Sequence, residues 1–297
     1  MKNKHFFCST LASLSVFLGT PGNFVQAQES DSQEVQIKFK GMVGDKAFNC
    51  EEVYNLGTPD TSVTPTDFRL YIFDVALIDE TGKTVPIILT QDGKWQYQNV
   101  ALLDFENKSG ACANGTAEMR DMVVGTVPKG NYKGVQFSLG VPFNLNHADA
   151  ALAPSPLNLT SLWWNWRGGY KFLRVDFSSG NNQDKQIAHN NHGKNTGFMI
   201  HLGSTGCQAS SENQKPTNCN NPNISKVSFN NFDISKNTII ADLKTLVANN
   251  NLATNQPDTP LGCMSAPTDG DCEGIMLNLG LPFNGKTASG QTFFRVE

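Results

Sequence analysis

The chain has no excess of positive charge. Lysine and arginine number 23 against 27 acidic residues, which gives a formal net charge of −4. A protein that binds nucleic acid needs a basic face to neutralise phosphates, so this balance argues against nucleic acid as a partner. Beyond residues 1–27 there is also no apolar run near the ~20 residues of a membrane-spanning helix, so we expect no membrane insertion.

The motifs of common enzyme classes are missing as well. There is no Gly-x-Ser-x-Gly elbow, no His-Glu-x-x-His pair and no nucleotide-binding loop. Ser204 lies close to His201 in sequence, but no supporting triad can be identified around it. We therefore predict that the chain is not an enzyme.

Cysteine is present, but never in the Cys-x-x-Cys spacing of a zinc or redox motif, nor in the Cys-x-x-Cys-His spacing of a haem attachment site. Apart from Cys8 there are six cysteines, and an even number in an exported chain argues for disulfides. If all six are paired, no thiolate remains to bind a metal. Short loops favour Cys207–Cys219 and Cys263–Cys272, which leaves Cys50 with Cys112.

Residues 1–27 have the order of a secretory signal peptide. Lys2 and Lys4 supply a charged start, residues 6–18 are mostly apolar, and residues 25–27 offer a small-residue cleavage site. In a Gram-negative host the mature chain would be periplasmic. Removal of the two lysines changes the balance to 21 basic against 27 acidic residues, or −6.

Short segments with β-strand patterns dominate the mature sequence. Residues 34–43 alternate between apolar and polar, and residues 68–78 are rich enough in β-branched and aromatic residues for a central strand. Many short strands with few helices predict one antiparallel β-sandwich domain over residues 34–297 with disulfide-stapled loops. Further strands are expected at 85–89, 100–105, 117–124, 132–139, 172–177, 198–202 and 227–232.

Two local predictions add detail to this fold. Residues 117–124 and 132–139 look like a pair, with the turn supplied by Pro128-Lys129-Gly130-Asn131. Apolar residues in 238–248 recur at helical spacing, so this segment is predicted to be a short C-terminal helix.

Three of the four tryptophans lie within the run Trp163-Trp164-Asn165-Trp166. If the run is extended, Trp164 and Trp166 point to the same face and form a wide, electron-rich wall. The alternative is a core plug, in which each indole N–H finds an acceptor. His147 precedes the run and His201 follows it.

Several segments in this order resemble one known family. They are Leu139–Asp149, which contains His147, then Pro154–Asn158, the tryptophan run with Gly169–Phe172, and Phe198–Cys207. The family is that of the MbnP-like copper-binding proteins, also called the four-cysteine partner of the metallo-mystery pair. The resemblance covers roughly residues 34–282.

The resemblance implies a chemical modification. In MbnP-like proteins the first tryptophan of Trp-x-Trp, here Trp164, becomes kynurenine through a partner di-haem enzyme of the cytochrome c peroxidase/MauG type. An intact indole is a poor ligand because its N–H only donates. Kynurenine has an aniline nitrogen and a carbonyl that can line or bind a metal site. Without a haem motif of its own, the chain would be the substrate of that enzyme.

The resulting hypothesis is a periplasmic protein of copper homeostasis that binds Cu(I). His147 and His201 would be ligands, since imidazole suits copper, and modified Trp164 would complete the site. Trp166 would support it, and Asp149 would orient His147 as a carboxylate behind a ligand. Without a metal, His147 is a loop histidine bonded to Asp149 or backbone, His201 is a satisfied inward-facing histidine, and Asp149 is a turn or cap residue.

Two alternatives remain open at this point. His189 and His192 in an Asn-rich loop are a second possible metal pair, although a solvated loop is the simpler interpretation. A secreted module that binds carbohydrate or protein without metal would use the tryptophans as a stacking surface. That second alternative predicts exposed indoles.

Overall fold

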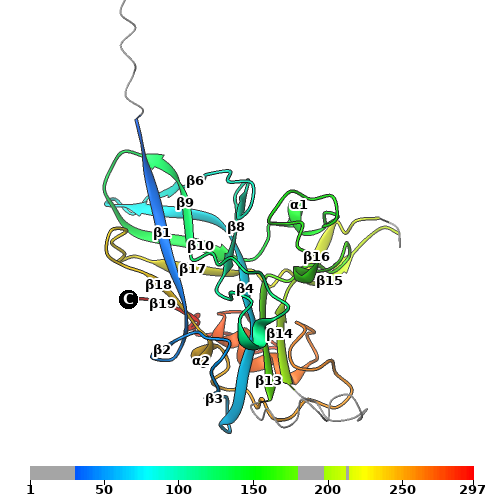
Figure 1. Cartoon of the computed structure of the whole chain (residues 1–297). Coiled ribbons are helices and arrows are strands. Elements are labelled where there is room, and N and C mark those ends of the chain that lie inside the picture. Colours follow the sequence, from blue (N-terminus) through cyan, green and yellow to red (C-terminus); the bar gives the residue numbers. More distant parts are fainter. Residues whose placement is uncertain (1–30, 180–196, 212–213) are drawn as a thin grey trace, which may run out of the picture. The chain divides into compact units, whose positions relative to one another are not determined.

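Two β-sheets dominate the computed structural model, which describes residues 31–179, 197–211 and 214–297 (Figure 1). Residues Ser32–Glu297 form one compact unit. No helix among the described residues combines the length and the hydrophobicity that a membrane span needs. The signal-peptide prediction for residues 1–27 and the histidines His189 and His192 lie outside the described residues.

The smaller sheet has the order β19-β18-β1-β9-β6, with β2 paired to β1. In β1 the side chains of Val35, Ile37 and Phe39 are buried while their neighbours are not, which confirms the alternation expected from the sequence. The pair β1–β18 is parallel and the other pairs are antiparallel. The strands are β1 Ser32–Val43, β2 Lys46–Ala47, β6 Ile88–Leu89, β9 Met122–Pro128, β18 Ile239–Asp242 and β19 Phe294–Val296.

The larger sheet is organised around β4 and has the order β14-β13-β4-β10-β17. The strands β3, β5 and β8 also pair with β4, and β7 pairs with β8. All of these pairs are antiparallel. The strands are β3 Tyr54–Leu56, β4 Thr61–Asp79, β5 Thr84–Pro86, β7 Gln96–Tyr97, β8 Val100–Asp104, β10 Tyr132–Leu139, β13 Leu173–Ser179, β14 Gly197–Leu202 and β17 Ser225–Phe229.

The two sheets pack face to face, as the sequence predicted for a β-sandwich. Phe39 of β1 contacts Phe137 of β10 edge-on, with ring centroids 5.5 Å apart. Phe137 also meets Phe294 of β19 at 5.1 Å. Since β10 belongs to the larger sheet and β1 and β19 to the smaller one, these rings form the core between them.

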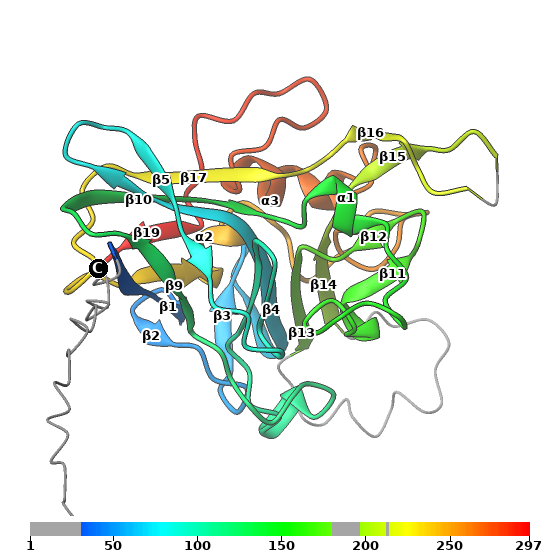
Figure 2. The ribbon, with the colours of Figure 1, turned by 90° about the horizontal axis from the view of Figure 1, so that it is seen from above.

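Two short hairpins and a one-turn helix lie beside β13 and β14 (Figure 2). They matter because they contain the tryptophan run and the cysteines Cys207 and Cys219, and because His147 directly follows the helix. The hairpins are β11 Trp163–Asn165 with β12 Gly169–Tyr170, and β15 Thr205–Gln208 with β16 Asn218–Asn221; the helices are α1 Phe143–Asn146, α2 Leu243–Leu246 and α3 Glu273–Asn278, with 3-10 turns η1 Gly110–Cys112, η2 Thr160–Leu162 and η4 Gly270–Cys272.

Three disulfides join the loops to the sandwich. Two are the pairs that short loops favoured, and the third joins the two cysteines that remained. They are Cys50–Cys112, Cys207–Cys219 and Cys263–Cys272. Such cross-links are typical of chains that mature in an oxidising compartment.

A short C-terminal helix is present, as predicted, but it covers only part of the predicted segment 238–248. Residues Ile239–Asp242 form β18, which pairs with β1, and only Leu243–Leu246 are helical. All four side chains of β18 are buried, so its apolar run shows no alternation and mimics a helix face. Asp242 begins α2 because its side chain accepts a hydrogen bond from the Lys244 N–H.

The predicted pairing of residues 117–124 with 132–139 is wrong. Strand β9 pairs with β1 and β6 in the smaller sheet, whereas β10 pairs with β4 and β17 in the larger one. Residues 129–131 therefore carry the chain from one sheet to the other. Sequence spacing cannot distinguish such a crossing from a hairpin, because both need a turn of the same length.

Candidate metal centre

The tryptophan run folds into a hairpin because the side chain of Asn165 closes its turn. Asn165 Oδ1 accepts hydrogen bonds from the backbone N–H groups of Arg167 at 2.9 Å and Gly168 at 2.7 Å. Gly169 follows with a φ of +76°, a conformation that favours glycine. The strands are short, with Trp163 opposite Tyr170.

This turn corrects the picture of an extended tryptophan wall. Trp164 belongs to β11, but Trp166 lies in the turn, so the two indoles do not share a strand face. The guanidinium of Arg167 lies over the Trp166 ring, 5.4 Å from its centroid. Trp164 and Trp166 therefore do not form one aromatic wall, and Trp164 is the tryptophan that we follow as part of a candidate site.

Asn146 at the end of α1 ties this hairpin to the rest of the molecule. Its Oδ1 accepts from the Tyr170 N–H at 2.8 Å, and its Nδ2 donates to Ser204 Oγ at 3.4 Å. A Cβ at Gly169 would lie 2.4 Å from Asn146 Oδ1, so this contact also requires glycine. The sequence did not point to Asn146, because a single asparagine gives no sign of its hydrogen bonds to residues as distant as Tyr170 and Ser204.

The indole of Trp164 forms one wall of a pocket of about 430 Å³. The ring lies against Gly203: a Cβ there would be 2.3 Å from Trp164 Cζ3, which real structures do not allow. Met264 lies in the same pocket, so a thioether and an indole line one space. The full lining is Trp164, Asn165, Arg167, Gly168, Ser204, Thr205, Gly206, Cys207 and Met264.

Met264 directly follows Cys263, a residue whose backbone pairs with the strand of His201. Cys263 N–H donates to the Met199 carbonyl at 2.8 Å, and His201 N–H donates to the Cys263 carbonyl at 2.9 Å. The bridge pairs Ile200 with Cys263 in parallel, so the residues that follow them, His201 and Met264, lie on neighbouring segments of the backbone. Sequence reasoning missed Met264, whose only signal was its position directly after Cys263.

His201 is oriented by a buried carboxylate. Its Nε2 lies 2.8 Å from Asp176 Oδ1, and both side chains are buried. Burial raises the pKa of Asp176, but the bond from His201 and the charge of Arg174 outweigh it and leave that pKa lowered. An ionised Asp176 can only accept, so Nε2 carries the proton and Nδ1 offers its lone pair.

The charge state of His201 suits a metal ligand. Burial lowers the pKa of His201 despite the partly opposing effect of Asp176, so the imidazole is neutral at pH 7. A histidine that donates its second N–H to a carboxylate is the common arrangement behind a metal-binding imidazole. The geometry therefore fits His201 as a donor through Nδ1.

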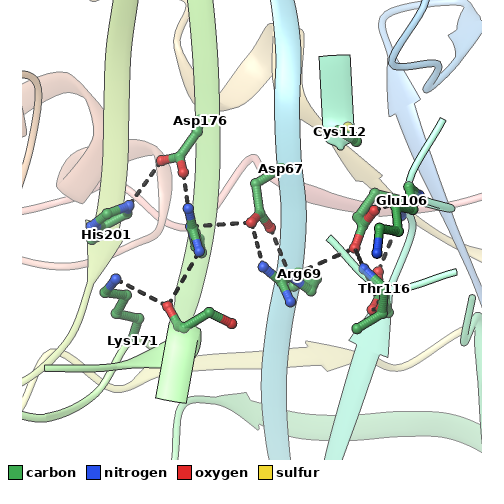
Figure 3. A network of polar contacts seen from close by, with 12 residues as sticks. Asp67, Arg69, Glu106, Cys112, Thr116, Lys171, Asp176 and His201 are labelled. Atoms are coloured by element: carbon green, nitrogen blue, oxygen red, sulfur yellow. Dashed lines mark hydrogen bonds and ion pairs between the residues drawn. The ribbon is translucent and has the colours of Figure 1, made fainter. Parts of the chain in front are cut away.

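Asp176 is itself one end of a row of alternating charges that crosses β13 and β4 (Figure 3). Arg174 Nε lies 2.8 Å from Asp176 Oδ2 and 3.1 Å from Asp67 Oδ2. Arg69 pairs with Asp67 in turn and lies 4.0 Å from Glu106. A buried charge is costly without a partner, so this row makes each member depend on its neighbours and holds Asp176 in place.

His147 has different surroundings. Its Nδ1 lies 3.0 Å from the Trp166 carbonyl oxygen, which can only accept, so Nδ1 carries the proton. Its Nε2 therefore presents the lone pair, 3.3 Å from Asn146 Nδ2 and 3.5 Å from Cys219 Sγ. Burial lowers the pKa of His147, which keeps the ring neutral.

Other groups than Asp149 orient His147. Asp149 Oδ1 accepts from the Ala151 N–H at 2.9 Å, which makes it a turn residue. His147 is oriented by the carbonyl of Trp166 and by Asn146 instead. Trp166 does support a candidate ligand, but through its backbone and not through its ring.

A family comparison decides the identity of the fold. The family model of MbnP matches residues 32–265. The chain belongs to the MbnP family. The solved structure of MbnP from Methylosinus trichosporium is 29% identical with a TM-score of 0.77, and the match covers 89% of this chain and 98% of that one. A comparison with curated proteins gave no match.

Within this MbnP fold, the expected site residues fall into two groups. Trp164 and Met264 share a pocket, and the strand of His201 pairs with Cys263, the residue before Met264. His147 instead joins Cys207 and Cys219, which form the one cluster of three close His, Cys or acidic ligand atoms found in the described part of the chain. That all three of His147, His201 and Trp164 hold one ion stays a prediction.

The indoles of the run are not a free stacking surface. Trp163, Trp164 and Trp166 are all half-buried, and Trp163 packs against the hydrophobic core. An MbnP fold that used these rings to bind sugars would have to expose their faces. The structure therefore gives no support to the alternative of a metal-free binding module.

Proposed function

We propose that the chain binds copper(I) in the pocket of Trp164, with His201 Nδ1 and Met264 Sδ as donors. The observation that carries this proposal is the position of Met264 in the lining of the Trp164 pocket, directly after Cys263, whose backbone pairs with the strand of His201. The imidazole of His201 is fixed by Asp176. Thioether and neutral imidazole are donors that copper(I) accepts, in sites with few ligands. Membership of the MbnP family and the resemblance to copper-binding sequences support the same ion.

Trp164 would take part after oxidation to kynurenine. The ring lies on Gly203 at the wall of the pocket, so opening it would put an aniline nitrogen and a carbonyl into that space. We propose a di-haem enzyme of the cytochrome c peroxidase/MauG type as the partner that supplies the oxidation. The copper carried in this pocket would serve copper homeostasis in the periplasm, a compartment in which the three disulfides are stable.

Metal analysis of the purified full-length chain tests this proposal. Protein produced together with a di-haem partner should retain one copper per chain, and protein produced alone should retain almost none, because the intact indole only donates. Zinc offered at equal concentration is the control ion. Copper-free protein whose Trp164 is fully converted would contradict the proposal.

Asp176→Asn should weaken copper binding without removing a donor. The amide cannot hold the Nε2–H tautomer of His201 as an anion does, so we expect a loss of about 10–100-fold in affinity. Competition with a chromophoric copper(I) chelator measures it. Asp149→Asn is the matched control, because Asp149 contacts only its own turn in the bonds described above. Equal affinities of the two variants at equal melting temperature would remove Asp176 from this role.

A further inference from the structure

The disulfide between β15 and β16 differs from the other two in its exposure and in its neighbours. Cys207 and Cys219 are both half-buried. The cysteines of the other two disulfides are at most 2% exposed: Cys50, Cys112, Cys263 and Cys272. Thiol–disulfide exchange needs direct access of the attacking thiolate to sulfur, so the Cys207–Cys219 bond should be the first to be reduced.

An imidazole is already aimed at this disulfide. His147 Nε2 lies 3.5 Å from Cys219 Sγ, and the ligand atoms of His147, Cys207 and Cys219 all lie within 4.8 Å of one another. The Trp166 carbonyl holds the opposite nitrogen, Nδ1, so Nε2 carries the lone pair, and it lies near both the amide of Asn146, at 3.3 Å, and Cys219 Sγ. This is the arrangement of a preorganised metal-binding histidine, with a backbone carbonyl as its anchor.

We propose that reduction of Cys207–Cys219 creates a second metal site, in which two thiolates and His147 Nε2 bind a soft ion such as copper(I). In the oxidised chain the sulfurs are bonded to each other and the site is closed. Cys207 also lines the Trp164 pocket, so the second site would adjoin that pocket while using a different histidine. A redox-dependent ligand set would let the chain hold additional copper only under reducing conditions.

The distances suit three-coordinate binding. With metal–sulfur bonds of about 2.3 Å and metal–nitrogen bonds of about 2.0 Å, a trigonal site needs roughly 3.7 Å between sulfur and nitrogen. The 3.5 Å between His147 Nε2 and Cys219 Sγ is close to that value. Once the S–S bond breaks, the side chain of Cys207 has to rotate, and the half-buried position leaves room for it.

The hairpin keeps both cysteines in place without the bond. Cys207 lies directly opposite Cys219, between the pairs Thr205–Asn221 and Gln208–Asn218. The N–H of Thr217 also donates to the Gln208 carbonyl at 2.8 Å. Lys215 is near enough to contribute to the lowered pKa of His147, and the same positive charge favours thiolate over thiol.

The chemistry balances with a dithiol as reductant. The dithiol transfers two electrons and two protons, the Cys207–Cys219 bond breaks, and the dithiol closes to its own disulfide. Both cysteines are then thiols. Copper(I) displaces the two thiol protons to solvent and binds the sulfurs and His147 Nε2.

The test uses full-length protein with His201→Ala, which removes a proposed ligand of the copper in the Trp164 pocket. Any copper that then binds after reduction is counted separately from the copper of that pocket. The protein is treated with a limiting amount of dithiol, freed of reagent, and titrated with copper(I) against a chromophoric chelator. Peptide masses after alkylation show which cysteines opened. We expect alkylation at Cys207 and Cys219 only, and one more copper per chain than in the oxidised sample.

Three further results decide the ligand set. His147→Ala should lower the affinity for the additional copper ion by about tenfold or more. Cys207→Ser with Cys219→Ser should abolish it; if that variant fails to fold, reduced protein with both cysteines alkylated gives the same answer. The proposal is overturned if reduction adds no copper, if another disulfide opens first, or if the His147 variant binds the added ion as tightly as the parent.

Discussion

Met264→Leu should lower the copper(I) affinity of the kynurenine-containing protein by about a hundredfold or more. This exceeds the loss expected for Asp176→Asn, because Met264 is a proposed donor and Asp176 only orients one. Leucine has nearly the same volume as methionine, so packing is preserved while the thioether is removed. His201→Ala should have an effect of similar size, since it removes the imidazole that we propose as the second donor. Chelator competition on protein produced with the di-haem partner measures both.

His147→Ala separates this arrangement from a site that uses both histidines. Its Nε2 faces the Cys207–Cys219 disulfide, so the oxidised protein should keep its pocket copper when the ring is removed. His192→Ala serves as the control histidine, because the sequence places it in an Asn-rich loop. Loss of copper from the His147 variant would show that the two imidazoles share one ion after all.

Trp164→Phe should abolish copper retention, because phenylalanine cannot become kynurenine. In the parent, the peptide with Trp164 should gain about 4 Da on coproduction with the partner, one oxygen gained and one carbon lost. Trp163→Phe is the matched control. It changes the adjacent ring, whose buried N–H has no hydrogen-bond partner to lose, and both the mass gain and the copper should survive.

Two outcomes would refute this assignment. One is a mass gain on Trp163 or Trp166 with Trp164 unchanged. The other is full copper loading of the Trp164→Phe variant, which would mean that His201 and Met264 suffice without the modified ring. Peptide mass spectra and metal content measured on the same preparations distinguish the two.

Much of the fold could be predicted because it depends on local pattern. Strand β1 alternates strictly, since one face meets the core, and strand β14 shows its buried set at Phe198, Ile200 and Leu202. Two disulfides followed from loop length and the third from the cysteines that remained. The segment at β18 could not be predicted, because its burial on both faces comes from strands distant in sequence.

The candidate site was harder for a related reason. Histidine and tryptophan are uncommon residues with distinctive chemistry, so the sequence singles out His147, His201 and Trp164 as candidates. Met264 and Asp176 have no sequence motif of their own; Asp176 is recognised only from its bond to His201, and Met264 only from its place in the Trp164 pocket. The sequence also could not show that the Asn165 turn would separate Trp166 from Trp164.

The hairpin that carries Trp164 has a consequence for the order of maturation. Its turn is closed by the side chain of Asn165, and its end is tied down by the amide of Asn146. Neither bond involves the indole of Trp164. If Trp164 is oxidised as we propose, these two contacts can form before the oxidation and remain after it, so folding would come first and modification second.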